Sequence, residues 1–346
     1  MLFRSAHAEV DQWNTDTELR ALDRMNALTL EVIMRVVFGV TDACTRDQLA
    51  PRLHRMVDIS PIVLLGWVFP SLGSIGPWKR FCHNQNEIDA LLYTEIARHR
   101  QAADLSRRTD VLSRLLQAGH QTDHAALTDA ELRDQLVTLL LAGHETTAAA
   151  LAWTLHELAR HPDIQHRACL AAHDNDDKYL EAVLKESMRL HPVIASTARK
   201  LTRDQVIGGW HLTAGTVVNT SILLAHLRRD SFPDAITYRP DRFLGGEVEP
   251  NTWLPFGGGV RRCIGAGFSL MEGTAVLREI LTRYTLTPSG GNAPERGRVR
   301  NITNVPRRGA RIAITPRHSV AQCQSTNPLP CSMRPPNFIS LNSRPQ

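Results

Sequence analysis

The sequence predicts a mainly α-helical fold with a small β part. Three observations lead to this expectation: long stretches carry apolar residues at helical spacing, the alternating runs are few and short, and one glycine pair marks a hairpin. The 346 residues are 42% hydrophobic and 22% charged, so the chain can bury a substantial core in one large domain or two.

The elements follow in chain order. Helices are expected where apolar residues recur at helical spacing, namely residues 19–40, residues 47–101 as two or three helices interrupted at Pro70 and Pro77, residues 129–160, and the segment from Ala266 onward. Strands are expected in short runs, namely residues 194–200, 206–212 with a hairpin at Gly208-Gly209, 217–219, 284–287 and 311–315.

One cysteine, Cys263, ends a glycine-rich run that begins at Phe256 and is followed by a predicted helix. The helix N-terminus favours a negative charge, and Gly257 lets the loop approach a flat macrocycle without a clashing side chain. A zinc site would need more cysteine or histidine ligands nearby, and a phosphate loop would need a different glycine-lysine pattern. A buried, inert cysteine is the remaining alternative. The pattern therefore indicates a thiolate ligand for one haem iron.

The cysteine loop resembles that of the cytochrome P450 family of haem-thiolate monooxygenases. The family pattern F-x-x-G-x-R-x-C-x-G is matched at Phe256, Gly259, Arg261, Cys263 and Gly265. The resemblance implies a cytochrome P450-like fold and haem b with Cys263 as the metal ligand. It also implies cofactor contacts from a set of loop and helix residues, namely Arg261, Phe256, Gly257, Gly265, Ala142 and Gly143.

Polar residues interrupt the long helix expected at 129–160, in the run from Ala142 to Thr147. Thr146 could simply bond back to a carbonyl one turn earlier. The resemblance instead implies a local distortion of the helix above the haem, where Glu145 and Thr146 steer protons during dioxygen activation. The presence of this acid-threonine pair favours dioxygen as the oxidant.

Further charged residues match the family in order. Glu186 and Arg189 share a helix face at i,i+3 spacing, which alone is also typical of an exposed ion pair. With Arg242 from a downstream loop, the resemblance implies a buried triad that positions the cysteine loop and takes no part in catalysis. Arg199 is a second candidate ligand for a haem propionate, or else an ordinary strand-edge residue, and His226 is interpreted as structural.

Charge and composition limit the classes of binding partner that this chain can have. The net charge is +5, and arginines gather near the cysteine loop and in residues 296–317. We expect a basic surface that docks an acidic electron carrier. A nucleic-acid binder is the alternative, but no recognition helix or aromatic platform accompanies the basic residues. No signal peptide is evident, the apolar run at 61–70 is too short to span a bilayer, and the scattered cysteines give no disulfide framework, so we expect a cytoplasmic monomer.

The resemblance implies a monooxygenase acting on a small apolar organic substrate. Electrons would come from NAD(P)H through a ferredoxin or flavodoxin and its reductase, because no flavin or nicotinamide domain is evident. The haem domain is expected at residues 1–317, with a disordered tail unrelated to the family at 318–346. Compared with the family, the chain begins late and has no W-x-x-x-R propionate contact. Looser haem binding is therefore expected, and an inactive truncated remnant is the alternative.

Overall fold

The structure is a computed structural model that describes residues 2–15, 18–39, 43–57, 76–118, 126–246, 248–289 and 295–317. The expected disordered tail at 318–346 and the apolar run at 61–70 lie outside these described residues. Within them the fold is mainly helical with a small β part, as the sequence predicts.

Helices make up most of the described chain. They are α1 (Leu2–Val10), α2 (Ala21–Phe38), α3 (Ala43–Val57), α5 (Gly76–Arg100), α6 (Val111–Ala118), α7 (Asp129–Arg160), α8 (Pro162–His173), α9 (Asp177–Leu190), α10 (Ile222–His226) and α11 (Ala266–Arg283). Short 3₁₀ turns are η2 (Leu105–Arg107), η3 (Pro240–Phe243) and η4 (Gly259–Arg261).

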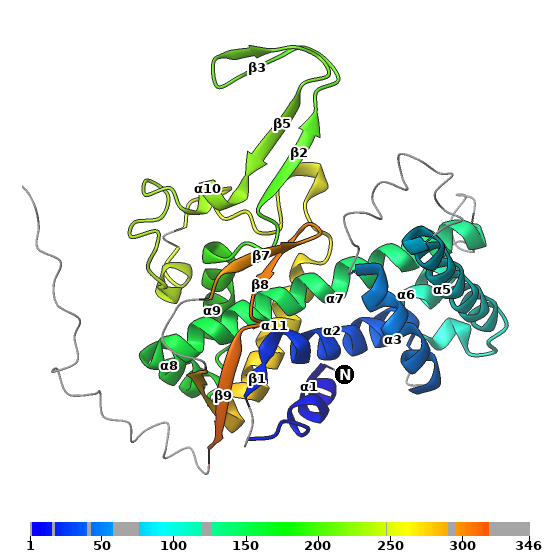
Figure 1. The fold of residues 1–346 in the computed structure, drawn as a ribbon, viewed down its shortest axis with the longest axis horizontal. Coiled ribbons are helices and arrows are strands. Elements are labelled where there is room, and N and C mark those ends of the chain that lie inside the picture. Colours follow the sequence, from blue (N-terminus) through cyan, green and yellow to red (C-terminus); the bar gives the residue numbers. More distant parts are fainter. Residues whose placement is uncertain are drawn as a thin grey trace, which may run out of the picture.

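The strands are short and antiparallel. They are β1 (Leu19–Arg20), β2 (Ser196–Lys200), β3 (Gln205–Ile207), β4 (Trp210–Leu212), β5 (Val217–Ser221), β6 (Tyr284–Pro288), β7 (Gly297–Arg300), β8 (Thr303–Pro306) and β9 (Arg311–Pro316). One sheet has the order β1-β9-β6, and the others are the pairs β2-β5, β3-β4 and β7-β8. In Figure 1 the β2-β5 ribbon leads away from the helices to the β3-β4 hairpin.

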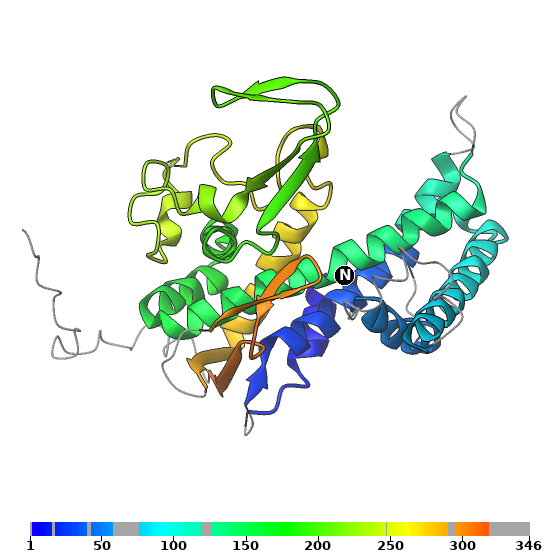
Figure 2. The same cartoon turned by 45° about the horizontal axis from the view of Figure 1, so that its top comes forward.

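Helix α7 runs through the length of the molecule with α2 alongside it (Figures 1 and 2). It begins with a capping box, in which Thr128 accepts from the backbone of Glu131 and the Glu131 side chain accepts from the backbone of Thr128. The first part of α7 packs on α2, α3, α5 and α6 in one apolar cluster. The second part packs on α8, α9, α11 and the β1-β9-β6 sheet in a larger one. The candidate site lies where α7 passes from one cluster to the other.

Most of the sequence expectations for individual elements are confirmed, with local corrections. Helix α7 has the expected bounds, α11 begins at Ala266, and the hairpin at Gly208-Gly209 forms with Val206 opposite His211. Pro77 does not interrupt a helix: α5 begins at Gly76, so this proline lies in the first turn, where its missing N–H group costs nothing.

Three kinds of feature depart from expectation. Strands β1, β7 and β8 were not predicted, because runs of two to four residues carry too little alternation to be recognised. Cys169 is disulfide-bonded, whereas the cysteines were expected to give no disulfides. Helix α7 is long and apolar enough to cross a membrane by length and composition, which the sequence analysis overlooked. Since 61% of its most apolar window is buried inside the protein, a core helix accounts for it equally well.

Candidate active site

The cysteine loop exposes one thiol on a well-held backbone. The Cys263 amide donates to the Phe256 carbonyl at 2.9 Å, and Gly257 adopts a positive φ of 68° that a side chain would strain. Helix α11 begins three residues later, with the Ser269 amide donating to the Gly265 carbonyl at 2.8 Å. The free thiol of Cys263 therefore stands exposed just before a helix N-terminus.

The surroundings of this thiol suit a flat apolar cofactor. Val260 and Ile264 on either side of Cys263 are 103% and 91% exposed. Phe256 packs partly against the larger apolar cluster and lies edge-on to Trp253, with ring centroids 5.8 Å apart. Large apolar side chains so exposed mark a surface that binds another molecule, and the face of a porphyrin would cover them. The residues present thus fit a thiolate-ligated haem.

Helix α7 presents an open stripe near this loop. Thr138, Ala142 and Thr146 recur at i,i+4 spacing, and none of them is buried. The next residue, Thr147, is buried and donates to the Ser269 hydroxyl of α11 at 3.1 Å, so α7 is joined to the helix that follows Cys263. The structure thereby brings the expected distal segment and the cysteine helix into contact.

Two residues of this segment have contacts that differ from expectation. The Thr146 hydroxyl donates to the Ala142 carbonyl at 2.8 Å, and α7 is continuous here, so the local distortion implied by the resemblance is not observed. A Cβ on Gly143 would lie 2.7 Å from the Ile33 side chain of α2. The absence of a side chain at Gly143 is therefore required for helix packing, and its haem contact stays a prediction.

Glu145 points away from the open stripe of α7. Its carboxylate is buried and accepts from the Arg300 guanidinium at 2.6 Å and from the Thr303 hydroxyl at 3.2 Å. Both partners lie on the β7-β8 hairpin, which the sequence analysis did not predict. The Glu145 carboxylate thus contacts the β7-β8 hairpin, whereas the Thr146 hydroxyl contacts the backbone of its own helix, although the two residues are neighbours in sequence.

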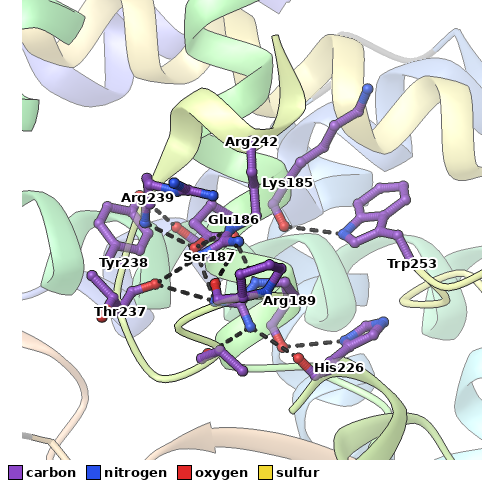
Figure 3. Close-up of polar contacts among 12 residues, drawn as sticks. Lys185, Glu186, Ser187, Arg189, His226, Thr237, Tyr238, Arg239, Arg242 and Trp253 are labelled. Carbon is purple, nitrogen blue, oxygen red and sulfur yellow. Dashed lines mark hydrogen bonds and ion pairs between the residues drawn. The ribbon is translucent and has the colours of Figure 1, made fainter. Parts of the chain in front are cut away.

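The three residues of the expected triad meet in the interior (Figure 3). Arg189 binds both oxygens of Glu186, at 2.7 and 2.9 Å, and Arg242 donates to the same carboxylate at 3.1 Å. All three are at most 2% exposed. The Arg239 backbone amide adds a further bond at 2.8 Å, and Arg189 also donates to backbone carbonyls at Ala235, His226 and Thr237. The one carboxylate therefore faces two guanidinium groups, and backbone carbonyls accept further hydrogen bonds from Arg189.

His226 connects the triad to the cysteine loop (Figure 3). One ring nitrogen, Nδ1, lies 3.1 Å from the Arg189 carbonyl, and the other, Nε2, accepts from the Leu254 amide at 2.7 Å. This requires the neutral Nδ1–H tautomer, and burial lowers the pKa of His226 to about 4. Trp253 adds a second link by donating to the Lys185 carbonyl at 3.1 Å. The sequence analysis assigned His226 a structural role but could not identify these partners.

The predicted propionate ligands are both exposed. Arg261 lies in η4, two residues before Cys263, and Arg199 lies on β2, where it donates to the Ala198 carbonyl at 2.8 Å. Of the other arginines near the loop, Arg278 pairs with Asp177, and Arg283 pairs with Asp11 and Glu279. In the C-terminal part, side chains pair with acids or a carbonyl of the chain at Arg300, Arg308, Arg311 and Arg317. These internal pairs reduce the basic surface available to nucleic acid.

Comparisons with known proteins agree with this geometry. The family description "Cytochrome P450" matches residues 4–308. "Putative cytochrome P450 135A1" of Mycobacterium tuberculosis is 55% identical over 328 residues, which are 95% of this chain and 73% of that protein. "Putative cytochrome P450 135B1" of Mycobacterium bovis is 40% identical over 315 residues, 89% of this chain and 66% of that protein.

Solved structures share the fold. Retinoic acid-bound cyanobacterial CYP120A1 superposes with a TM-score of 0.78 at 24% identity, covering 91% of this chain and 73% of that one. The haem domain of cytochrome P450DA gives a TM-score of 0.77 at 24% identity, with 91% and 72% covered. The chain belongs to the cytochrome P450 family, whose members are haem-thiolate monooxygenases. Family membership implies haem, dioxygen and a redox partner.

Proposed function

We propose that this chain binds haem b through the Cys263 thiolate and inserts one atom of dioxygen into an apolar organic substrate. The single observation that carries the proposal is the exposed thiol of Cys263, whose backbone amide donates to the Phe256 carbonyl and which lies beside exposed Val260 and Ile264. Haem, when bound there, supplies dioxygen activation, and a thiolate ligand donates electron density that favours O–O cleavage.

The other residues of the site would bind, orient or move protons. The exposed guanidinium groups of Arg261 and Arg199 suit haem propionates, because such pairs form charge-assisted bonds. Thr146 would release the Ala142 carbonyl and turn its hydroxyl toward the open stripe, and Glu145 would supply the proton from the other side of α7. The triad of Glu186, Arg189 and Arg242 would act only by positioning the loop.

Electron delivery would take place beside the thiol. Arg261 and Arg262 are exposed there, whereas Arg278 and Arg283 are engaged with acids of the chain. An acidic ferredoxin or flavodoxin, reduced by an NAD(P)H-dependent reductase, matches this charge. We also propose that the protein is a cytoplasmic monomer, as expected from the sequence. Arg262→Glu should slow reduction by such a carrier and weaken its salt dependence, while leaving chemical reduction by dithionite unchanged.

The experiment that tests the proposal is the carbon monoxide difference spectrum of the reduced protein after haem titration. We expect haem uptake that saturates only with excess haem, and the red-shifted Soret band of a thiolate ligand. Cys263→Ala should abolish that band, and Cys82→Ala, which changes the partly buried free cysteine of α5, should leave it unchanged. A normal spectrum in Cys263→Ala would overturn the assignment. Haem uptake without any product, even with surrogate redox partners, would favour an inactive remnant.

A further inference from the structure

We propose that Arg300 positions Glu145: it holds this carboxylate ionised and turned toward the β7-β8 hairpin, and thereby controls when Glu145 can carry a proton. The inference rests on the proposed proton-steering role of Glu145. Arg300 entered the sequence analysis only as one member of a basic run.

The contacts at Glu145 converge on one oxygen. The Nε and Nη2 atoms of Arg300 both lie 2.6 Å from Glu145 Oε1, and the Thr303 hydroxyl lies 3.2 Å from the same atom. A guanidinium group only donates hydrogen bonds and keeps its proton in proteins. The positive charge of Arg300 beside this oxygen favours the ionised carboxylate, and a proton placed on Oε1 itself would displace Arg300.

The hairpin that carries Arg300 is fastened to α7 independently of Glu145. The Trp153 indole of α7 donates to the Asn304 carbonyl at 3.1 Å, and the Asn304 amide donates to the Val193 carbonyl at 2.7 Å. Arg300 itself stands at the end of β7, and its side chain remains 22% exposed. The base of the hairpin is thus anchored. Arg300 lies near the turn, where its guanidinium group can break its contact with Glu145 and hydrogen-bond to water instead.

The other titratable groups near Arg300 carry no competing charge. His54 of α3 has a lowered pKa because of burial and the positive charge of Arg300. His144 of α7 has its pKa lowered to about 4, mainly by burial. Both rings are therefore neutral near pH 7, and Arg300 is the cation that faces Glu145 within the described part of the chain. Removing Arg300 is therefore a direct way to change the protonation of Glu145.

The test is infrared difference spectroscopy of the Glu145 carboxyl group as a function of pH, which needs no bound haem. Subtracting the spectrum of Glu145→Gln isolates the band of interest. In Arg300→Gln, the conversion of the carboxylate band to the protonated carboxyl band should move to higher pH by about half a unit, because an opposite charge at a partly exposed site has been removed. Arg300→Lys should return the transition most of the way to the pH of the parent protein, because it keeps the positive charge. Arg298→Gln, an equal charge change at an exposed site on the same strand, should leave it unchanged.

A second readout connects the ion pair to the reaction. The acid limb of the pH profile for coupling of oxygen use to product should move upward in Arg300→Gln by the same amount, and should be absent in Glu145→Gln. An unmoved infrared transition in Arg300→Gln would overturn the inference. If the infrared band moves but Glu145→Gln retains normal coupling at every pH, the ion pair stands and the proton-steering role of Glu145 fails.

Discussion

Glu186 and Glu145 are both helix carboxylates buried beside arginines, yet they are held in opposite ways. Glu186 uses both oxygens, two arginines and a backbone amide, and its partners lie 3, 53 and 56 residues away. The ion pair of Glu145 uses one oxygen and a single, partly exposed arginine 155 residues away. The first arrangement is closed to solvent on every side, whereas the second can open at one point.

This difference matches the roles that the two regions would have. A carboxylate that keeps a metal-ligand loop in place has to stay charged and immobile, which full compensation ensures. A carboxylate that moves a proton has to change its charge during the reaction, so it needs a partner that can leave. The comparison therefore predicts unequal costs when each region is disturbed.

The largest effect is expected at the triad. Arg189→Met should lower the free energy of unfolding by about 3–5 kcal/mol, because buried Glu186 would lose both of its hydrogen bonds from Arg189 and three backbone carbonyls would lose their donor. Chemical denaturation measures this cost, and haem uptake should fall with it. Arg98→Met is the matched control: Arg98 also pairs with a glutamate at i,i+3 spacing, Glu95, but its side chain is 52% exposed, so the cost should stay below about 1 kcal/mol. Equal costs would remove the distinction between closed and open pairs.

A third buried carboxylate, Glu272 of α11, extends the comparison to a group without a partner. It is 1% exposed, neither oxygen accepts a hydrogen bond from the described residues, and burial raises its pKa from 4.5 to about 8. A carboxyl whose pKa is raised on folding contributes stability below pH 4.5 that is lost as the pH rises toward 8. Glu272→Gln should therefore stabilise the protein at pH 7 by up to about 3 kcal/mol.

The Glu272 prediction is checked by measuring the free energy of unfolding between pH 5 and 8, at intervals of about half a pH unit. The fall in stability over this range should be shallower in Glu272→Gln than in the parent. Glu131→Gln at the start of α7 should keep the parent slope, because hydrogen bonds from Thr128 lower the pKa of Glu131 from 4.5, outside this pH range. A slope unchanged in Glu272→Gln would show that this carboxyl is ionised in the folded state.

A smaller effect is expected at the helix crossing beside Glu145. Gly143→Ala would place a Cβ 2.7 Å from Ile33 Cδ1 and should cost about 1–3 kcal/mol through overpacking. In the Ile33→Ala background the same change should cost little, since the clashing atoms are gone. Gly267→Ala in α11, where nothing lies within 4 Å, should be neutral or slightly stabilising. A cost that persists with Ile33→Ala would indicate another constraint on Gly143.

The smallest effect is expected at the Glu145 ion pair. Arg300→Gln should lower the free energy of unfolding by less than about 1 kcal/mol, because the arginine is partly exposed and water can replace it. Thermal and chemical unfolding of this variant should therefore resemble those of Arg298→Gln. A cost as large as that of Arg189→Met would mean that Glu145 is locked in the same way as Glu186, and that the hairpin does not open at Arg300.

The two regions also show how far the sequence could be read. Glu186 and Arg189 lie one helical turn apart, and Arg242 follows in a short loop, so local spacing and family resemblance predict all three. The bounds of α7 were equally accessible, because its apolar spacing continues over many turns. The partner of Glu145 was not, since β7 and β8 are four residues each and no local pattern relates residue 145 to residue 300.

Other omissions have the same physical origin. The Gly143–Ile33 contact depends on how two helices cross, and no local pattern in a single sequence encodes that crossing angle. His99 is similar: it is fully buried, and its two ring nitrogens lie 3.0 and 3.1 Å from the carbonyls of Glu95 and Phe38. These two carbonyls come together only when α2 packs against α5, so the sequence does not indicate them as partners of His99. The tertiary partners of isolated polar residues in an apolar helix therefore could not be predicted from the sequence.

The link from His226 to Leu254 has a consequence for protein engineering. The segment that leads to Cys263 begins near Leu254, whose amide donates to the His226 ring. This ring is fixed by the Arg189 carbonyl at the end of α9, so the segment cannot be transferred on its own. Transplanting residues 253–265 alone into another scaffold would leave an amide without its acceptor and an indole without its carbonyl. A successful graft would have to carry α9 and the histidine with it, as one unit built from three distant stretches of chain.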